Sequence, residues 1–258
     1  MVIILLFIVQ WYVSVFMQSF YLHRFAAHGM MEMSFFWSRT FYLITTVVQG
    51  PSFLNPRAYA ILHTLHHGYS DTEKDPHSPH HTKNALTMVW ETFNIYTDIR
   101  KRRIHQNFPI KRECVDWPFF ENINNTRLMR IVLIGVYFAL YWNFATSPWL
   151  WLLFPVHLFI GPLQGALVNW FGHKYGYVNY EDVKDHSRNT LAIDFLCLGE
   201  LYQNNHHKFP KDINFAQKKN EKDLGLVVIE MFEKMGIVTF ARRVRTTDEN
   251  EDRVKQNV

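Results

Sequence analysis

The segment His63-Thr64-Leu65-His66-His67 decides how the rest of the chain is organised. Its three histidines stand at positions i, i+3 and i+4, so they share one face if the segment is helical. Imidazole nitrogens gathered in this way are typical of sites for iron, copper or zinc. The spacing therefore predicts a helix with a metal-binding face.

Five further histidines lie in three other places along the chain: His23 and His28, the isolated His173, and His206 and His207. Eight imidazoles are too many for one tetrahedral zinc ion but enough for two metals. Most of them border uncharged segments long enough to enter a bilayer, where ionisable groups are usually functional. We therefore interpret them as parts of one two-metal site rather than as surface histidines.

The spacing of His23 and His28 favours two different metals for these two ligands. Five residues of an α-helix turn through roughly 500°, which leaves about 140° between the two imidazoles. On an α-helix they are therefore not expected to bind one metal side by side.

Long uncharged segments predict an integral membrane protein. Residues 1–22 carry no charge, and neither does the stretch of about 40 residues from Ile131 to His173, which is long enough for two passes. A turn near Asn143 to Pro148, flanked by tryptophans, divides this stretch. Membrane helices are thus expected at about 1–22, 131–147 and 149–170.

The fold class that follows is all-α, an integral-membrane helical bundle with a cytosolic helical cap that holds the histidine-rich di-metal site. Residues 40–55 are uncharged but short, so they are expected to be interfacial or re-entrant. We expect a single domain over 1–240 and a charged, mobile tail over 241–258.

The distribution of Lys and Arg predicts the orientation in the membrane. Of 27 basic residues, none precedes Arg24 or lies inside the predicted hairpin. The positive-inside rule then places every histidine cluster on the cytoplasmic face of a multi-pass protein. The net charge of +4 suits an anionic membrane surface and an anionic substrate head group, and nucleic-acid binding is not expected because the basic residues follow topology.

Several acidic residues stand close enough to hold metal-bound imidazoles by their second nitrogen. Asp71 and Asp75 follow the central cluster, and Glu200 precedes the last pair. His77, beside Pro76, could be a metal ligand, a hydrogen-bond donor behind the ligands or a residue that orders its loop, and we favour the last two roles.

Two carboxamides also belong to the candidate site. Asn169 and His173 are spaced i and i+4, so Asn169 can offer its oxygen to a metal or to a bound water. Gln203 precedes His206 and His207 by three and four residues, which repeats the spacing of the central cluster with Gln in place of His. Gln203 is therefore a possible but weak ligand, and one metal has a poorer or open position.

Together these motifs resemble the histidine boxes of integral-membrane fatty-acyl desaturases, in particular the acyl-CoA (stearoyl-CoA desaturase-like) branch. The boxes read His23-Arg24-Phe25-Ala26-Ala27-His28, His63-Thr64-Leu65-His66-His67 and Gln203-Asn204-Asn205-His206-His207. The similarity extends to Ser70 through His77 and to Asn169 through His173, and it covers about Tyr21 to Pro210.

The resemblance implies an O2-dependent desaturase with two Fe ions. In that family iron activates O2 with two electrons from a separate donor, and two adjacent methylenes lose hydrogen to leave a cis double bond. Carried over by position, Asn169 would contact iron through water, and the iron ligands would be His23, His28, His63, His66, His67, His173, His206 and His207.

The resemblance implies three partners: a long-chain acyl-CoA or acyl-lipid substrate, membrane lipid, and an electron donor of ferredoxin, rubredoxin or cytochrome b5 type. The implied double bond is of the Δ9 type. The chain departs from the family in two ways. The acyl-CoA branch usually has His at the position of Gln203, and it has a further helix upstream of the first box, so either a helix has been lost or the reading frame begins late.

Two other functions compete with desaturation. A fatty-acyl or lipid hydroxylase would use the same di-iron site. The other is a non-enzymatic metal or haem membrane protein. Haem would need paired axial histidines in opposed helices, and metal transport would need polar groups through the bilayer. Only His157 is expected at membrane depth, so the sequence favours neither. Within the desaturase interpretation, Trp11 or Phe7 is expected to limit how deeply the acyl chain enters.

Overall fold

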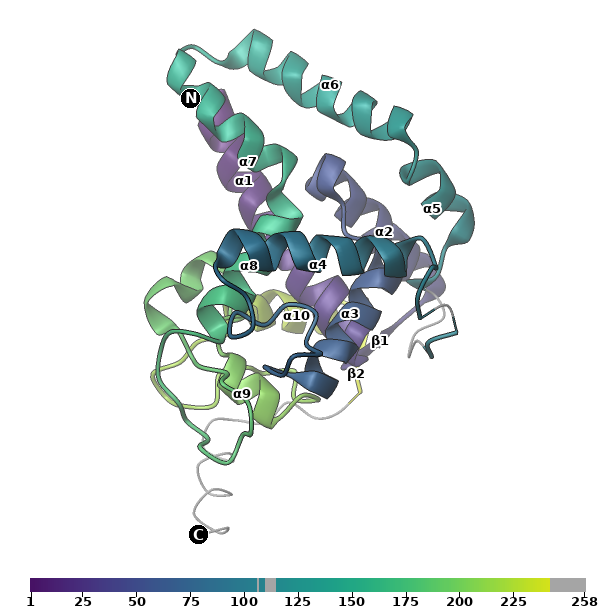
Figure 1. Cartoon of the computed structure of the whole chain (residues 1–258). Helices are drawn as coiled ribbons and strands as arrows, with labels where there is room; N and C mark the ends of the chain where they lie inside the picture. Colours follow the sequence, from purple (N-terminus) through teal and green to yellow (C-terminus); the bar gives the residue numbers. More distant parts are fainter. Residues whose placement is uncertain (106, 110–114, 242–258) are drawn as a thin grey trace.

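The computed structural model describes residues 1–105, 107–109 and 115–241, so the predicted tail lies outside the described residues from 242 onward. The described chain is mostly helical (Figure 1). The strands are β1 (Met31–Met33) and β2 (Val238–Phe240). The helical elements, in chain order, are α1 (Val2–Met17), η1 (Gln18–His28), α2 (Phe35–Gln49), η2 (Gly50–Ser52), α3 (Pro56–Tyr69), α4 (Ala85–Arg100), α5 (Pro118–Asn124), α6 (Arg127–Phe144), η4 (Pro148–Leu153), α7 (Phe154–Leu158), α8 (Ile160–Gly172), η5 (Leu191–Leu196), α9 (Gln203–Lys208) and α10 (Leu224–Lys234).

The first helix extends beyond the predicted residues 1–22. α1 continues into η1, and together they form one helix from Val2 to His28. η1 is a π-helix, whose backbone hydrogen bonds join residues five apart rather than four. It ends at Gly29, whose φ of 63° is a left-handed conformation that glycine adopts without a side-chain clash.

The second apolar stretch is more broken than the sequence suggested. α6 begins at Arg127, where the Thr126 side chain accepts a hydrogen bond from the Met129 amide, and ends at Phe144. The helix expected at 149–170 is instead η4, α7 and α8, with a bend of 75° before Ile160. Pro162 explains the break, because proline lacks the N–H that would continue the helix across this point.

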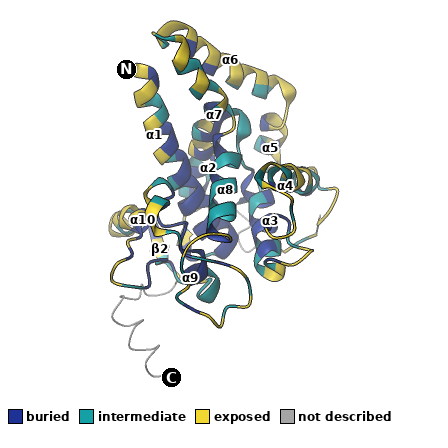
Figure 2. Ribbon diagram, turned by 60° about the vertical axis from the view of Figure 1, so that its left-hand side comes forward, coloured by how far each residue is buried: buried dark blue, intermediate teal, exposed yellow. Residues whose placement is uncertain are grey.

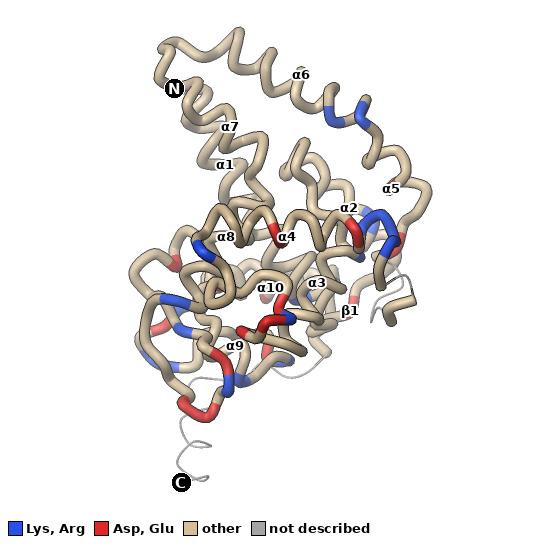
Figure 3. Tube along the Cα trace, in the orientation of Figure 1, with Lys and Arg blue, Asp and Glu red and all other residues tan. Residues whose placement is uncertain are grey.

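Two helices, Val2–His28 and Arg127–Phe144, are long and apolar enough to cross a membrane, and the bent pair makes a third candidate. This is compatible with a membrane protein. α6 exposes much of its apolar surface (Figure 2), and Lys, Arg, Asp and Glu lie mainly away from α1, α7 and most of α6 (Figure 3). α2, which overlaps the short stretch 40–55, is not among these candidates in the described chain.

α3 carries the central histidines and packs along η1. Its start follows from local sequence: the Asn55 side chain accepts a hydrogen bond from the Ala58 amide, and Pro56 occupies the first turn. This fixes the register in which α3 presents its histidines toward η1.

The all-α expectation misses one small feature, a two-stranded antiparallel sheet. β1 follows η1 directly and pairs with β2, so that Met31 stands opposite Phe240 and Met33 opposite Val238. The main hydrophobic core includes residues from η1, α2, α10 and β2. β2, which follows α10, is thereby paired with β1, which follows the first histidine pair.

Candidate metal centre and adjoining cavity

The structure brings the eight predicted histidines into two adjacent groups. One, called here the five-histidine group, has ligand nitrogens that all lie within 4.8 Å of one another. The other, the three-histidine group, meets the same limit. The five-histidine group contains His23, His28, His63, His67 and His206, and the three-histidine group contains His66, His173 and His207.

The distances inside the five-histidine group fit a shared metal. The Nε2 atoms of His28 and His63 are 2.7 Å apart, and the Nε2 atom of His67 is 3.0 Å from those of both His63 and His206. Two nitrogens bound at right angles to one metal, each at about 2.1 Å, stand roughly 3 Å apart. The nitrogens therefore already have the separation that a common metal requires.

The three-histidine group fits a metal by a different observation. His66, His173 and His207 each direct Nδ1 to a carboxylate, and their Nε2 atoms are buried without a hydrogen-bond partner in the described chain. A neutral imidazole that donates through Nδ1 carries its lone pair on Nε2. Three buried lone pairs that converge without a partner are a donor set suited to a cation.

The placement of His23 and His28 corrects the expectation that they serve different metals. Both lie in the five-histidine group, with ring centroids 4.9 Å apart. The expectation assumed α-helical geometry, but η1 is a π-helix, in which residues five apart are stacked about one turn apart. The local helix type thus brings both imidazoles to one face.

Four carboxylates fix the orientation of histidines in the two groups. Asp71 bonds His173 at 2.8 Å, Asp75 bonds His66 at 2.9 Å, and Glu200 bonds His23 at 2.5 Å. Each of these acids was a sequence candidate. The fourth, Asp185, bonds His207 at 2.5 Å and was missed, because nothing in its sequence spacing connects it to a residue 22 positions later.

The electrostatics of Asp71 and Asp185 agree with these roles, whereas burial raises the pKa of Asp75 to about 6. Burial alone would raise the pKa of Asp71, but hydrogen bonds from His173, Ser78 and the His186 amide outweigh it and lower the pKa to about 2. The same balance, with His207 as the main partner, lowers the pKa of Asp185. Both groups are therefore carboxylates at neutral pH and can accept the Nδ1 protons.

Glu200 belongs to a buried ionic network beneath the five-histidine group. Its other oxygen lies 3.1 Å from Arg24, which also bonds Asp223 at 2.6 Å and lies over the ring of Phe215. Burial would raise the pKa of Glu200, but His23 and Arg24 outweigh this and lower it. Arg24, inside the first histidine box, thus holds the acid that holds His23.

Several of these histidines are held in the neutral form. Burial lowers the pKa of His63, His66 and His67 well below the ordinary value, and the neighbouring imidazoles lower it further. The pKa of His206 is lowered for the same two reasons. Neutral imidazoles are the form that binds a metal.

The two carboxamides, Asn169 and Gln203, belong to neither histidine group, and each donates a hydrogen bond to a backbone carbonyl. Asn169 donates its Nδ2 hydrogen to the Gly165 carbonyl at 2.8 Å, and Gln203 donates its Nε2 hydrogen to the Glu200 carbonyl at 2.6 Å. Gln203 packs so closely on Gly172 that a Cβ there would lie 2.4 Å from the Gln203 Cγ. Their roles toward a metal stay predictions.

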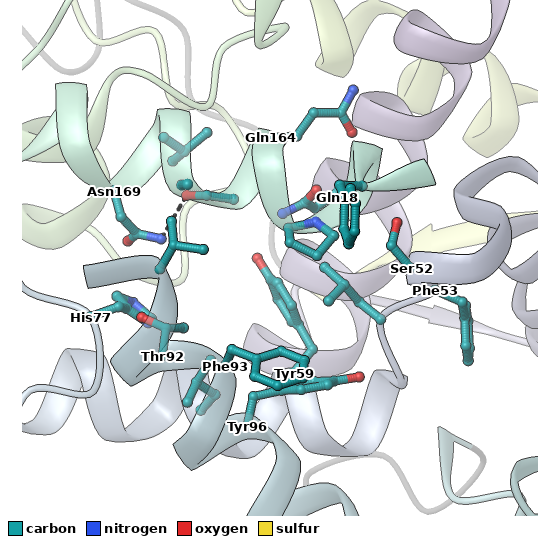
Figure 4. Close-up of a pocket in the computed structure, with 18 of the residues that line it drawn as sticks. Gln18, Ser52, Phe53, Tyr59, His77, Thr92, Phe93, Tyr96, Gln164 and Asn169 are labelled. Carbon is teal, nitrogen blue, oxygen red and sulfur yellow. Dashed lines mark hydrogen bonds between the residues drawn. The ribbon is translucent and has the colours of Figure 1, made fainter. Parts of the chain in front are cut away.

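His77 is buried, and its ring lies 4.4 Å from that of His66. Its backbone amide, rather than its ring, bonds Asp75, while neither ring nitrogen has a hydrogen-bond partner in the described chain. A side-chain role in ordering the loop thus gains no support from hydrogen bonds. Figure 4 shows His77 on the same side of the cavity as Asn169.

A cavity of about 590 Å³ adjoins the five-histidine group, and part of its lining is drawn in Figure 4. His23, His63 and Asn169 line it, and most of its other lining residues are apolar or aromatic, including side chains of α3, α4, α6 and α8. A mostly apolar space that reaches metal-binding histidines suits a mostly apolar ligand with a reacting position near the metals.

The lining of the cavity differs from the expectation for Trp11 and Phe7, since neither residue lines it. Val15 and Gln164 do. Gln164 accepts a hydrogen bond from Ser14 at 2.7 Å and donates one to the Trp11 carbonyl, so this pair of helices is joined just beyond the cavity. The Trp11 indole instead donates to the Leu196 carbonyl.

The protein combines apolar helices, two histidine groups and an adjoining, mostly apolar cavity. This combination is typical of metal-dependent enzymes that act on lipid-like substrates. A sequence model of the fatty acid desaturase family matches residues 1–216. The chain therefore belongs to the fatty acid desaturase family, and it is an oxidoreductase of lipid metabolism.

Three relatives show the breadth of this similarity. The chain is 30% identical to a hex-5-enoyl-[acyl-carrier protein] acetylenase of Moorena producens, with 89% of this chain and 73% of the relative covered. It is 26% identical to the Delta-9 desaturase-like 4 protein of Arabidopsis thaliana (72% and 59% covered) and 29% identical to an sn-1 stearoyl-lipid 9-desaturase of Synechocystis (68% and 52%). The chain thus spans between about half and three quarters of these relatives.

Proposed function

We propose that this protein is a membrane di-iron desaturase that inserts a cis double bond into a fatty-acyl chain, using O2 and two electrons from a separate donor protein. The observation that carries the proposal is the pair of adjacent histidine groups beside an acyl-sized cavity. Two iron ions bound there would supply the oxidising power that removal of hydrogen from unactivated methylenes needs.

The ligands we propose are the members of the two groups, with Asn169 reaching the three-histidine group through a water. The carboxylates do the orienting: Asp71, Asp75 and Asp185 accept the Nδ1 protons and so direct the Nε2 lone pairs inward. Because these bonds are buried, the imidazoles are held in position before a metal binds.

The cavity performs the second task, which is to hold two adjacent methylenes next to the metals. Its apolar walls on α3, α4 and α8 would bind the acyl chain and exclude water from the reacting carbons. Since a chain in a closed space reaches a fixed depth, the same walls would select which carbons react.

For the acyl carrier we propose a thioester, with acyl-CoA as the form implied by the histidine boxes and the Δ9 position as the first to examine. The relatives' names mention both an acyl-carrier protein and lipid-linked stearoyl chains, so both carriers belong in the same assay. The bundle is proposed to be multi-pass, with the metal centre on the cytoplasmic face.

The experiment that tests the proposal is elemental analysis of the purified protein, compared with a His66→Ala, His207→Ala double variant. About two irons per chain, lost in part in the variant, are expected. Zinc alone, or a metal content that does not respond to these histidines, would overturn the di-iron assignment.

Product analysis then separates desaturation from hydroxylation at the same site. The iron-loaded protein, O2, a reducing system and saturated acyl-CoA should yield an olefin two mass units lighter than the substrate. An alcohol sixteen units heavier as the main product would instead identify a hydroxylase.

A further inference from the structure

We propose that Gln18 and Tyr59 form a polar stop across the acyl cavity, which favours chains with only about five carbons beyond the reacting pair. The inference rests on the proposed function and names the length of acyl substrate for the same cavity. It begins from one of the buried carboxamides in the cavity lining, Gln18.

Gln18 is held between two helices. On one side it faces Tyr59 of α3 (Figure 4). On its other side it packs against Gly165 of α8, where an added Cβ would lie 3.2 Å from the Gln18 Nε2. Figure 4 shows the Tyr59 hydroxyl directed toward Gln18, between the Asn169 side of the cavity and the Ser52 side.

The Gln18 oxygen has no partner. Gln18 is 6% exposed, and its Oε1 makes no hydrogen bond in the described chain. A short acyl chain would leave room for water beside this oxygen, and a polar cavity wall can hold such a water. A chain that continues past Gln18 would displace the water and bury the oxygen unpaired, which weakens binding by roughly tenfold.

The position of the pair sets the number of carbons. Tyr59 precedes His63 by one turn of α3, and its ring stacks on the His63 ring with centroids 5.8 Å apart. Four residues of α-helix rise about 6 Å, and an extended chain advances about 1.2 Å per bond, so roughly five carbons fit between the metal ligands and the stop.

A second limit lies deeper. Val15 also lines the cavity, three residues before Gln18 on the first helix, and the Ser14–Gln164 hydrogen bond joins the helices there. Three helical residues correspond to about 4.5 Å, or three to four further carbons. Removing the polar stop should therefore lengthen the accepted chain by about that number and no more.

The experiment measures chain-length preference with the iron-loaded full chain and saturated acyl-CoAs of 8 to 18 carbons. Binding is followed by the shift in thermal unfolding, and the number of carbons beyond the new double bond is found by mass spectrometry. The variants are Gln18→Leu, which removes the carboxamide, and Tyr59→Phe, which removes the hydroxyl but keeps the ring on His63.

The matched control is Gln10→Leu. Gln10 is also a buried glutamine of the first helix, but it bonds the Val48 carbonyl and the Tyr137 hydroxyl and does not line the cavity. The wild type and this control should favour chains with about five carbons beyond the double bond. Gln18→Leu and, to a smaller extent, Tyr59→Phe should extend this by three to four carbons and strengthen binding of the longer chains roughly tenfold.

Two outcomes would overturn the inference. Affinity that rises steadily to 18 carbons in the wild type, with no change in either variant, would show that the pair imposes no limit while leaving the proposed function intact. Failure of every acyl-CoA to bind would overturn the proposed function and this inference with it. If Gln18→Leu does not fold, Tyr59→Phe decides the question alone.

Discussion

The two histidine groups differ in how their imidazoles are held in position for a metal. The five-histidine group has many imidazoles in close nitrogen contact, with a carboxylate seen at His23. In the three-histidine group every imidazole is held by its own carboxylate, Asp71, Asp75 or Asp185. A site with fewer ligands depends more on how each is oriented, so we expect the three-histidine group to be the more sensitive of the two.

The largest effect is expected from His207→Ala. The three-histidine group would keep two imidazoles, so the iron content should fall from about two to about one per chain and desaturation by more than about 1,000-fold. Iron is measured by elemental analysis and desaturation by product formation.

The neighbouring residue provides the matched comparison. His206 belongs to the five-histidine group, which would keep four imidazoles after His206→Ala. This variant should retain close to two irons at saturating metal, with weaker affinity. Equal iron loss in the two variants would contradict the claim that number of ligands protects the five-histidine group.

A smaller effect is expected from Asp185→Asn, which keeps the size of the side chain but cannot accept the His207 proton as a carboxylate does. Metal affinity at the three-histidine group should fall by about 10- to 100-fold, because loss of the acid frees the imidazole to rotate. The affinity is found by competition with a chelator. Asp182→Asn is the control, since the exposed Asp182 pairs with Lys208 rather than with a histidine.

The sequence predicted the membership of the centre better than its internal arrangement. Spacing within each box is local, so His63, His66 and His67 could be placed on one helix without knowledge of the fold. Which histidine joins which group depends on the packing of α3, α8 and α9. His66 therefore joins the three-histidine group although both its box partners join the other.

The features that the sequence analysis did not predict also depend on tertiary packing. η1 is a π-helix whose residues are all buried, and a helical wheel drawn from the sequence contains neither fact. Asp185 reaches His207 from the loop after α8, and Asp185 itself lies outside every histidine box. The break before α8, in contrast, could have been foreseen from Pro162.

Glu200→Gln is expected to affect stability more than metal content. The five-histidine group should keep its metal with a loss of affinity below about tenfold, since its other ligands remain. Arg24, fully buried, would lose one of its two acidic partners, and removal of a buried ionic partner costs about 3 kcal/mol. Thermal unfolding and iron content, measured on the same preparation, separate the two effects. A loss of metal as large as in Asp185→Asn would show that the two groups depend equally on their acids.

The smallest effect, and the one that most sharpens the comparison, is expected from Gln203→His. Gln203 lies against Gly172, next to His173, so an imidazole in its place would start from the edge of the three-histidine group. A fourth imidazole should raise metal affinity there a few-fold, since imidazole is a better ligand for iron than a carboxamide. Gln203→Leu is the control, because it also removes the hydrogen bond to the Glu200 carbonyl but adds no ligand. Chelator competition should then rank the variants as His above wild type above Leu. If the His and Leu variants hold the metal equally well, position 203 does not face the metal, and the three-histidine group depends on its carboxylates and Asn169 alone.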